Sequence, residues 1–223
     1  MVSSFGPRQL VLALDHAVSF ARDDFLPGPS NAAALALIDR WPDWPARVMA
    51  LVGPLGSGKS HLAAIWAEAA GARVLAAKLL PETDLPAAFA TGALVVEDVD
   101  PEGLDERALF HLLNLAREQE AYVLITSRSA PSGFTVGIRD LASRLRAVPA
   151  IALAPPDDVL LRSLIVKLAA DRQLAVDDAL VNYLANRIER SFEAAHAVVA
   201  RLDEEALRQH RPVTRALASE LFR

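Results

Sequence analysis

Eight consecutive residues have the composition of a phosphate-binding loop. They read Gly53-Pro54-Leu55-Gly56-Ser57-Gly58-Lys59-Ser60. The glycines let backbone N–H groups turn toward phosphate oxygens without a clash from Cβ, the lysine can reach the outer phosphates, and the serine hydroxyl can bind Mg²⁺. An apolar run precedes the loop and a helical pattern follows it, so a helix N-terminus adds partial positive charge there. The pattern predicts binding of a nucleoside triphosphate or diphosphate.

The residues expected to contact this nucleotide are those of the loop other than its leucine, together with the next residue along the chain: Gly53, Pro54, Gly56, Ser57, Gly58, Lys59, Ser60 and His61. A chance glycine-rich turn is the alternative interpretation, and the strand–helix frame argues against it.

The five histidines show no spacing typical of a metal site. We therefore expect them to be structural or to face solvent rather than to hold a metal.

Two carboxylates stand at the end of the apolar run Leu94-Val95-Val96. At the carboxyl edge of a parallel sheet, such acids face the phosphate crevice. One of Glu97 and Asp98 is expected to hold Mg²⁺ together with Ser60, and the other to orient or deprotonate the attacking water. The usual order places Asp first, whereas Glu97 comes first here, so we expect slow hydrolysis. A solvated strand end is the alternative interpretation.

The segments that must position these residues alternate along the chain between apolar runs typical of strands and patterns typical of helices. Apolar runs predict strands at 48–52, 74–77, 93–96, 122–126 and 150–153, and helical periodicity appears at 59–70 and 105–118. Continuous apolar strands separated by helices indicate a parallel sheet covered on both faces. Ser30 or Asn31 is expected to cap a helix that precedes the first of these strands. After Pro155-Pro156, only helical patterns follow.

We therefore expect three regions along the 223 residues. Residues 1–22 form an N-terminal tail, residues 23–155 an α/β nucleotide-binding domain, and residues 156–223 a small all-helical domain. The predicted breaks between helices in the last region fall near 171–178, near 189–192 and at Arg211-Pro212, because turn-forming residues interrupt the periodicity there.

Composition excludes several classes of function. The chain has no cysteine, which excludes disulfides, thiolate metal sites and cysteine nucleophiles. Its net charge of −5 argues against an extended basic surface, so we expect no direct sequence-specific DNA binding. No apolar stretch reaches the roughly 18 residues that span a bilayer, and the N-terminus does not resemble a secretory signal. The chain is expected to be cytoplasmic, without a membrane partner.

Taken together, these motifs resemble the AAA+ ATPases of the DnaA/Hda family, and most of all the Hda-type regulatory inactivators of the replication initiator DnaA. The resemblance covers almost the whole chain. The matching segments are Gly53 to Ser60 for Walker A, Leu94 to Asp98 for Walker B, Phe25 to Asn31 for the segment leading to the adenine pocket, Thr126-Ser127-Arg128 for the first sensor, and Leu141 to Leu145 for the arginine-finger segment.

The resemblance implies a P-loop NTPase fold of the AAA+ type, with a parallel five-stranded sheet followed by a helical lid. It implies ATP or ADP with Mg²⁺ as cofactors, and it implies catalytic roles for Asp98, Thr126, Ser127 and Arg144. The second sensor of the family is an Arg, but the gap-free match places Glu193 at that position. Either Arg190, one turn earlier, contacts the nucleotide instead, or the role is absent and discrimination between ATP and ADP is in doubt.

The resemblance also implies two protein partners. Arg144 would enter the ATP site of a DnaA subunit and stimulate hydrolysis there; a surface arginine in an ion pair is the alternative. Gln9, Leu10, Leu12 and Leu14 resemble the peptide by which proteins dock on the DNA polymerase sliding clamp. Its alternative is a first strand or helix that packs on the core. No sequence remains after the lid for a helix-turn-helix domain, which favours the inactivator over an initiator.

Three other functions remain open at this point. A stand-alone, loader-like ATPase would hydrolyse its own ATP, and a non-hydrolysing adaptor would hold ADP and only bridge partners. A DNA-binding regulator is disfavoured by the acidic balance of the chain. We expect weak hydrolysis by the chain itself, with homo-oligomerisation left open.

Overall fold

The computed structural model describes residues 19–222. These residues divide into two compact units. The first unit, which we call the sheet unit, consists of residues 19–161 and 190–192. The second, the helical unit, consists of residues 162–189 and 193–222. The short segment 190–192 thus belongs to the sheet unit although it lies between two parts of the helical unit in the sequence.

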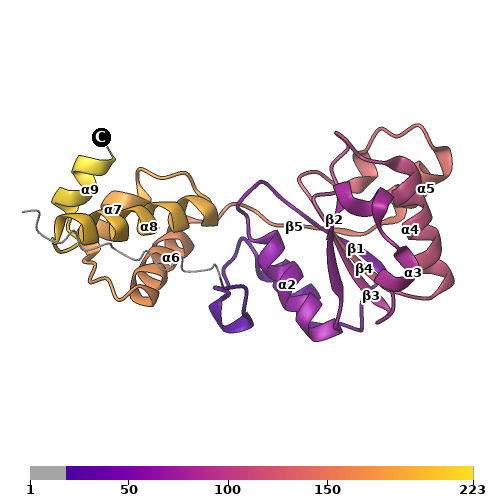
Figure 1. Cartoon of the computed structure of the whole chain (residues 1–223), viewed down its shortest axis with the longest axis horizontal. Helices are drawn as coiled ribbons and strands as arrows, with labels where there is room; N and C mark the ends of the chain where they lie inside the picture. Colours follow the sequence, from indigo (N-terminus) through magenta and orange to yellow (C-terminus); the bar gives the residue numbers. More distant parts are fainter. Residues whose placement is uncertain (1–18, 223) are drawn as a thin grey trace, which may run out of the picture. The chain divides into compact units, whose positions relative to one another are not determined.

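Within the described residues, a five-stranded parallel sheet forms the centre of the sheet unit (Figure 1). The strands lie in the order β2-β3-β4-β1-β5. Their bounds are β1 Val48–Val52, β2 Arg73–Ala76, β3 Ala93–Glu97, β4 Tyr122–Ser127 and β5 Ala150–Ala152. This confirms the predicted α/β fold class, since each predicted apolar run overlaps one strand.

Helices cover both faces of the sheet, because every strand places alternate side chains on opposite faces. Leu94 and Val96 contribute to a core shared with one set of helices, whereas Val95 contributes to the other. Figure 1 shows α2 on one side of the strands and α3, α4 and α5 on the other. The helical elements of this unit are η1 Arg22–Asp24, α1 Ala32–Asp39, α2 Lys59–Ala70, η2 Ala77–Glu82, α3 Leu85–Ala88, α4 Glu106–Glu118, η3 Pro131–Gly133 and α5 Arg139–Ala147.

The beginning of α1 differs from the expected helix cap. Asn31 is the N-cap residue, but its side chain makes no capping hydrogen bond. Instead, its Oδ1 accepts a hydrogen bond from the Gly28 N–H at 2.8 Å, and its Nδ2 donates to the Leu26 carbonyl at 3.0 Å. The buried asparagine therefore fixes the turn that precedes the helix, and the backbone N–H of Leu35 bonds to the Asn31 carbonyl.

The helical unit packs its helices around a core made mostly of leucine and alanine side chains, with some valine. Its elements are α6 Asp158–Asp171, whose first turn belongs to the sheet unit, α7 Asp178–Ala185, α8 Phe192–Gln209, whose first residue belongs to the sheet unit, and α9 Arg215–Leu221. Asp177 caps α7 by accepting from the Leu180 N–H at 2.7 Å, and Thr214 caps α9 in the same way. Within residues 19–222, no helix is long and apolar enough to cross a membrane.

Candidate nucleotide-binding site

The glycine-rich loop begins between two strands at the carboxyl edge of the sheet. The Gly53 N–H donates to the Ser127 carbonyl of β4 at 3.1 Å, and the Leu153 N–H donates to the Val52 carbonyl at 2.6 Å. A Cβ atom on Gly53 would lie 2.5 Å from the Leu153 carbonyl oxygen. Glycine is therefore required here for close backbone approach, because the atom that blocks a side chain is backbone and cannot move aside.

The loop leaves several backbone N–H groups available for an anion. Gly56 and Gly58 have φ values of 67° and 92°, in the left-handed region that glycine adopts without strain. Within the described part of the chain, the N–H groups of Gly56, Gly58, Lys59 and Ser60 have no hydrogen-bond acceptor. Because α2 begins at Lys59, these donors gather at a helix N-terminus, which favours phosphate. The arrangement fits a nucleotide phosphate.

Lys59 spans this loop. Its Nζ donates to the carbonyls of Gly53 and Pro54, both at 2.8 Å. An ammonium has three N–H donors, so one remains for a ligand. Burial lowers the pKa of Lys59, and the carboxylates of Asp98, Asp100 and Glu97 act in the opposite direction.

The two predicted acids occupy different environments at the end of β3. Glu97 is half-buried, and its Oε1 is buried without a hydrogen-bond partner among the described residues. Asp98 is exposed and has a φ of 57°, and its N–H donates to Thr126 Oγ1 at 3.0 Å. Of the carboxylates that raise the pKa of Lys59, Asp98 has the largest effect. Asp98 is therefore the acid most strongly coupled to the loop lysine.

Thr126 and Ser127, expected to sense the nucleotide, are fully buried at the end of β4. The Thr126 hydroxyl accepts the Asp98 N–H, and the Thr126 carbonyl accepts the Val99 N–H at 2.9 Å. The Ser127 hydroxyl donates to the Ser129 carbonyl at 2.7 Å and lies 3.2 Å from Asp100 Oδ1. These hydroxyls hold the strand ends that carry the acids.

Sequence analysis missed an ion pair next to these residues. Asp100 Oδ2 accepts from Arg128 Nε at 2.7 Å, and Asp100 Oδ1 accepts from the Arg128 backbone N–H at 2.9 Å. Burial raises the pKa of Asp100, but the hydrogen bonds from Arg128 and Ser127 outweigh it and hold that pKa below the usual range. The pair joins the segment after β3 to the residue after β4. The only feature of the sequence that could have indicated this ion pair is the presence of a second aspartate, Asp100, two residues after Asp98.

His61 lies on α2 but its side chain faces the segment that precedes α1. Its Nε2 lies 2.9 Å from the Ala21 carbonyl oxygen. Its ring makes edge-to-face contacts with Phe20 and Phe25, with centroid separations of 5.5 and 5.2 Å. Phe25 belongs to the segment expected to lead to the base pocket, so the structure joins His61 to that segment rather than to the phosphate-binding N–H groups.

Phe192 contacts the glycine-rich loop. The Phe192 N–H donates to the Gly56 carbonyl at 2.9 Å, and the Phe192 ring lies near Gly58. Arg190, the candidate second sensor, instead pairs with Asp158, with Nη2 2.7 Å from Oδ1. Glu193 is exposed. In this structure, Arg190 therefore pairs with a carboxylate and not with a residue of the glycine-rich loop.

Arg144 is not part of this group of residues. It lies on α5 and lines a hollow together with Arg47 and Val48 at the beginning of β1, whereas the glycine-rich loop follows the end of β1. Its guanidinium lies over the Phe110 ring, 5.3 Å from the centroid. Residues 9–14, the predicted clamp-binding peptide with Gln9, Leu10, Leu12 and Leu14, lie outside the described residues.

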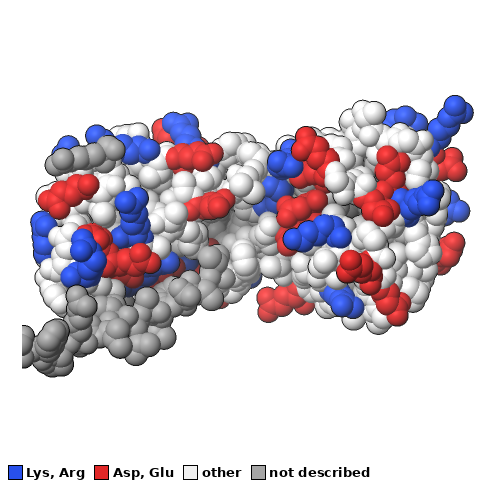
Figure 2. Space-filling model, turned by 45° about the horizontal axis from the view of Figure 1, so that its top comes forward, with Lys and Arg blue, Asp and Glu red and all other residues white. Residues whose placement is uncertain are grey.

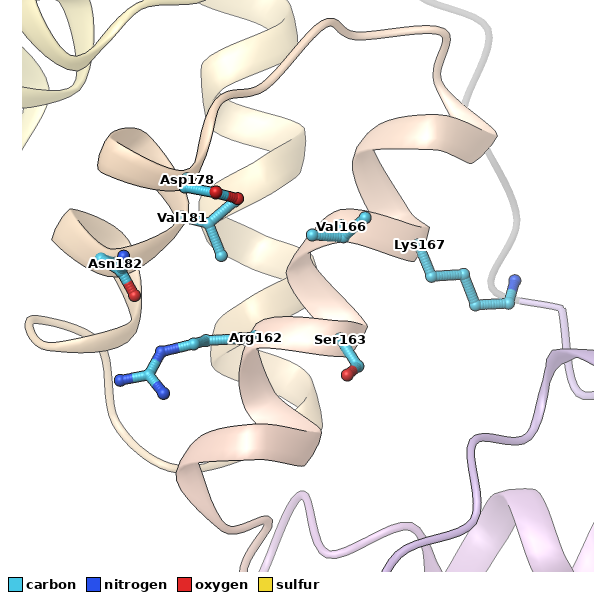
Figure 3. A pocket seen from close by; sticks show the side chains of 7 residues that line it. All are labelled: Arg162, Ser163, Val166, Lys167, Asp178, Val181 and Asn182. Carbon is cyan, nitrogen blue, oxygen red and sulfur yellow. The ribbon is translucent and has the colours of Figure 1, made fainter.

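The helical unit has a hollow of its own, of about 390 Å³. Its lining residues come from α6 and α7, and Figure 3 shows Val166 of α6 and Val181 of α7 among them. The residues that line it include none of those predicted to bind nucleotide. Within residues 19–222, no group of three or more histidine, aspartate or glutamate side chains could hold a metal ion by itself.

Comparisons with known proteins agree with this architecture. A family model described as the Hda lid domain matches residues 158–220. The fold is similar to domain III of the replication initiation protein DnaA from Thermotoga maritima, with a TM-score of 0.73, 18% identity, and coverage of 91% of this chain and 95% of that one.

Two other solved structures share the fold. AMPPCP-bound DnaA from Aquifex aeolicus has a TM-score of 0.66 at 16% identity, with 84% of this chain and 68% of that chain covered. The Thermotoga maritima RuvB Holliday junction branch migration motor has a TM-score of 0.69 at 18% identity, with 91% and 70% covered. The AAA+ fold is thus common to these proteins and this chain.

Replacing Lys59 tests the phosphate cradle. Lys59→Ala should weaken ATP and ADP binding by about 10- to 100-fold, because a charge-assisted hydrogen bond contributes about 1.5–3 kcal/mol. Titration with a fluorescent nucleotide measures the change, and Lys78→Ala, an exposed lysine of η2, is the matched control. Equal affinities for the two variants would contradict the assignment.

The Asp100–Arg128 pair predicts a pH-dependent contribution to stability. Because the folded-state pKa of Asp100 lies below its ordinary value of 3.8, the contribution is present above that value and is lost as the pH falls through the folded-state pKa. Asp100→Asn should lower the unfolding free energy by about 1 kcal/mol at pH 7. Urea unfolding between pH 7 and pH 3 should show this deficit shrinking in acid, whereas Glu118→Gln should show no deficit.

Proposed function

We propose that the chain is a nucleotide-bound regulator of the DnaA/Hda type that stimulates ATP hydrolysis by the replication initiator DnaA. This reaction converts the initiator to its ADP form and so negatively regulates the initiation of DNA replication. The match of residues 158–220 to the Hda lid domain and the DnaA-like fold support this proposal. One observation carries the proposal: Arg144 lies at the opposite end of β1 from the chain's own phosphate cradle. At that distance from the loop, Arg144 would not contact the nucleotide of its own chain, but it would be free to contact a nucleotide held by a neighbouring molecule.

The chain's own nucleotide has a supporting role in this proposal. Lys59 and the N–H groups of the glycine-rich loop would hold the phosphates of ATP or ADP. Mg²⁺ would be held by Ser60, by Asp98 or Glu97, and by phosphate oxygens, because Mg²⁺ commonly uses only one or two protein carboxylates. Bound nucleotide would fix the contact between Phe192 and the loop, and with it the beginning of α8.

Hydrolysis by the chain itself is expected to be weak. Arg190 is engaged by Asp158, and Glu193 stands where the resemblance would place a cationic residue. Neither side chain would then balance the charge that develops on a transferring phosphoryl group. The same observation favours one alternative function, a non-hydrolysing adaptor that holds ADP and bridges partners without altering their ATPase rate.

Arg144 would act in trans. An arginine supplied by a neighbouring molecule stabilises charge on the transferring phosphoryl group and can raise the rate by roughly 10³- to 10⁵-fold. The Phe110 ring under the Arg144 guanidinium restricts the side chain before the partner arrives. Less conformational entropy is then lost when the guanidinium meets the phosphate.

Docking on the DNA polymerase sliding clamp would place this activity at the replication site. Gln9, Leu10, Leu12 and Leu14 would bind a preformed apolar pocket on the clamp. Only clamp loaded on DNA would then recruit the chain, which raises the local concentration of Arg144 near the initiator.

Arg144→Ala tests the proposed reaction. The variant should lose stimulation of initiator ATP hydrolysis while its own ADP affinity stays within about twofold of wild type, because the side chain lies away from the cradle. Arg146→Ala, an exposed arginine of the same helix, is the matched control. Full stimulation by Arg144→Ala would exclude the role, and binding without any stimulation by the wild type would favour the adaptor.

The clamp peptide generates a separate prediction. Gln9→Ala combined with Leu12→Ala should weaken binding to DNA-loaded clamp by at least about tenfold, since anchor side chains commonly contribute 2 kcal/mol or more. Surface plasmon resonance with clamp loaded on immobilised DNA measures the affinity. A Ser3→Ala, Ser4→Ala double variant changes the same tail outside the peptide and should bind normally. An unchanged affinity of the first variant would show that the anchor lies elsewhere.

A further inference from the structure

The hollow next to Arg144 combines an apolar floor with a cationic rim. Its volume is about 440 Å³, and it lies where α4 and α5 end and β1 begins. Val48, Leu113, Ala116 and Val148 contribute apolar surface to it. This volume is within the range of about 300–1,000 Å³ that is typical of ligand pockets.

Three guanidinium groups and one carboxylate line this hollow: Arg47, Arg117, Arg144 and Glu120. The carboxylate is already engaged, because Glu120 Oε2 lies 3.2 Å from Arg47 Nη2. Arg47 also lies over the Tyr122 ring, 5.0 Å from its centroid. Arg117 is exposed, and among the described residues it has no ion pair or hydrogen-bonding side chain. The rim therefore has an excess of positive charge and at least one arginine available to a partner.

This excess contrasts with the rest of the molecule. The chain carries a net charge of −5. On the face that Figure 2 shows, basic and acidic side chains are interspersed over both units. A local group of three arginines on an acidic protein selects an acidic occupant and repels a basic one. The apolar floor further selects a large apolar side chain, because a hydrated anion alone gains nothing from burial there.

We propose that this hollow docks an acidic segment of the protein whose ATP site receives Arg144. One large apolar side chain of that segment enters between Leu113 and Val148, and a flanking carboxylate pairs with Arg117. The inference rests on the proposed function, because it takes the initiator as the partner. It adds a division of labour to that function: the hollow holds the partner, and Arg144 remains available for the phosphoryl group.

The position of Arg144 supports this division. It lies on the rim, so a segment seated on the apolar floor brings the partner's surface against the guanidinium. Buried apolar anchors surrounded by charged rims carry most of the binding energy at protein interfaces. Rim charges mainly govern association and its dependence on salt. Arg117 should therefore affect binding, whereas Arg144 should affect the rate of hydrolysis after binding.

Charge reversal at Arg117 tests the docking. Arg117→Glu should weaken binding of the full-length chain to ATP-loaded initiator by at least about tenfold and should reduce the dependence of affinity on salt. Arg107→Glu is the matched control, because Arg107 is an exposed arginine of the same helix that does not line the hollow. Fluorescence anisotropy with labelled initiator at two salt concentrations gives both quantities.

A second variant fills the hollow without changing charge. Ala147 is exposed and lines the hollow at the end of α5, so Ala147→Phe should block the apolar side chain of the partner and weaken binding to a similar degree. Circular dichroism and the ADP affinity of each variant show whether the fold is intact. Arg144→Ala should bind the initiator within a few-fold of wild type while failing to stimulate it.

The outcomes separate this inference from the proposed function. Normal binding by both Arg117→Glu and Ala147→Phe, with stimulation intact, would overturn the docking site and leave the function standing. Absence of binding and stimulation by the wild type would overturn both. If decanoate bound the hollow in an Arg117-dependent way while initiator binding was unaffected by Arg117→Glu, the hollow would be a small-molecule site and the protein-docking proposal would be wrong.

Discussion

The close approach of Gly53 to β5 fixes the geometry of the whole site. The Gly53 backbone lies so near the Leu153 carbonyl that any Cβ would overlap it. One hydrogen bond holds Gly53 to β4, and another holds the preceding Val52 to the residue after β5. The loop therefore leaves the sheet in one direction, and α2 begins six residues later at Lys59. Without this constraint, the N–H groups of Gly56 to Ser60 would not be held pointing toward one common phosphate position.

A second set of hydrogen bonds places the acids relative to that loop. Asp98 and Val99 are held by Thr126, and Asp100 is held by Arg128. The hydrogen bonds of Gly53, Asp98 and Val99 all end on β4, and Arg128 directly follows it; β4 lies between β1 and β3 in the sheet. Strand β4 thus connects the phosphate-binding loop to the carboxylates, which explains why its last residues are polar yet fully buried. Preorganisation of this kind is what nucleotide sites require, since reorganising dipoles during the reaction would raise the barrier.

The sequence was sufficient to predict the elements whose signals are local. The apolar run of β1, the glycine-rich loop and the bounds of α2 follow from residue types within a window of a few residues, and the structure has α2 at the predicted Lys59–Ala70. The acidic end of β3 was equally evident. Helix α5, by contrast, was not identified as a helix from periodicity, because its nine residues include three arginines and only two leucines.

Features that depend on long-range contacts were not predictable. Nothing in the neighbourhood of Arg128 indicates that Asp100, 28 residues earlier, binds it. The pairing of Arg190 with Asp158 similarly depends on how α6 begins beside residues 190–192. Asn31 was expected as a helix cap from its position, but its amide instead bonds to the preceding turn. The group of arginines around the α4–α5 hollow comes from three separate segments, so only the fold reveals it.

The central claim is that this chain acts on a nucleotide held by another molecule. Single-turnover hydrolysis of labelled ATP tests it most directly, with the label bound beforehand either to the initiator or to this chain, and with DNA-loaded clamp present. We predict that mixing the two proteins accelerates hydrolysis only of the ATP bound to the initiator. Acceleration confined to the label bound to this chain would contradict the account and would identify a stand-alone ATPase.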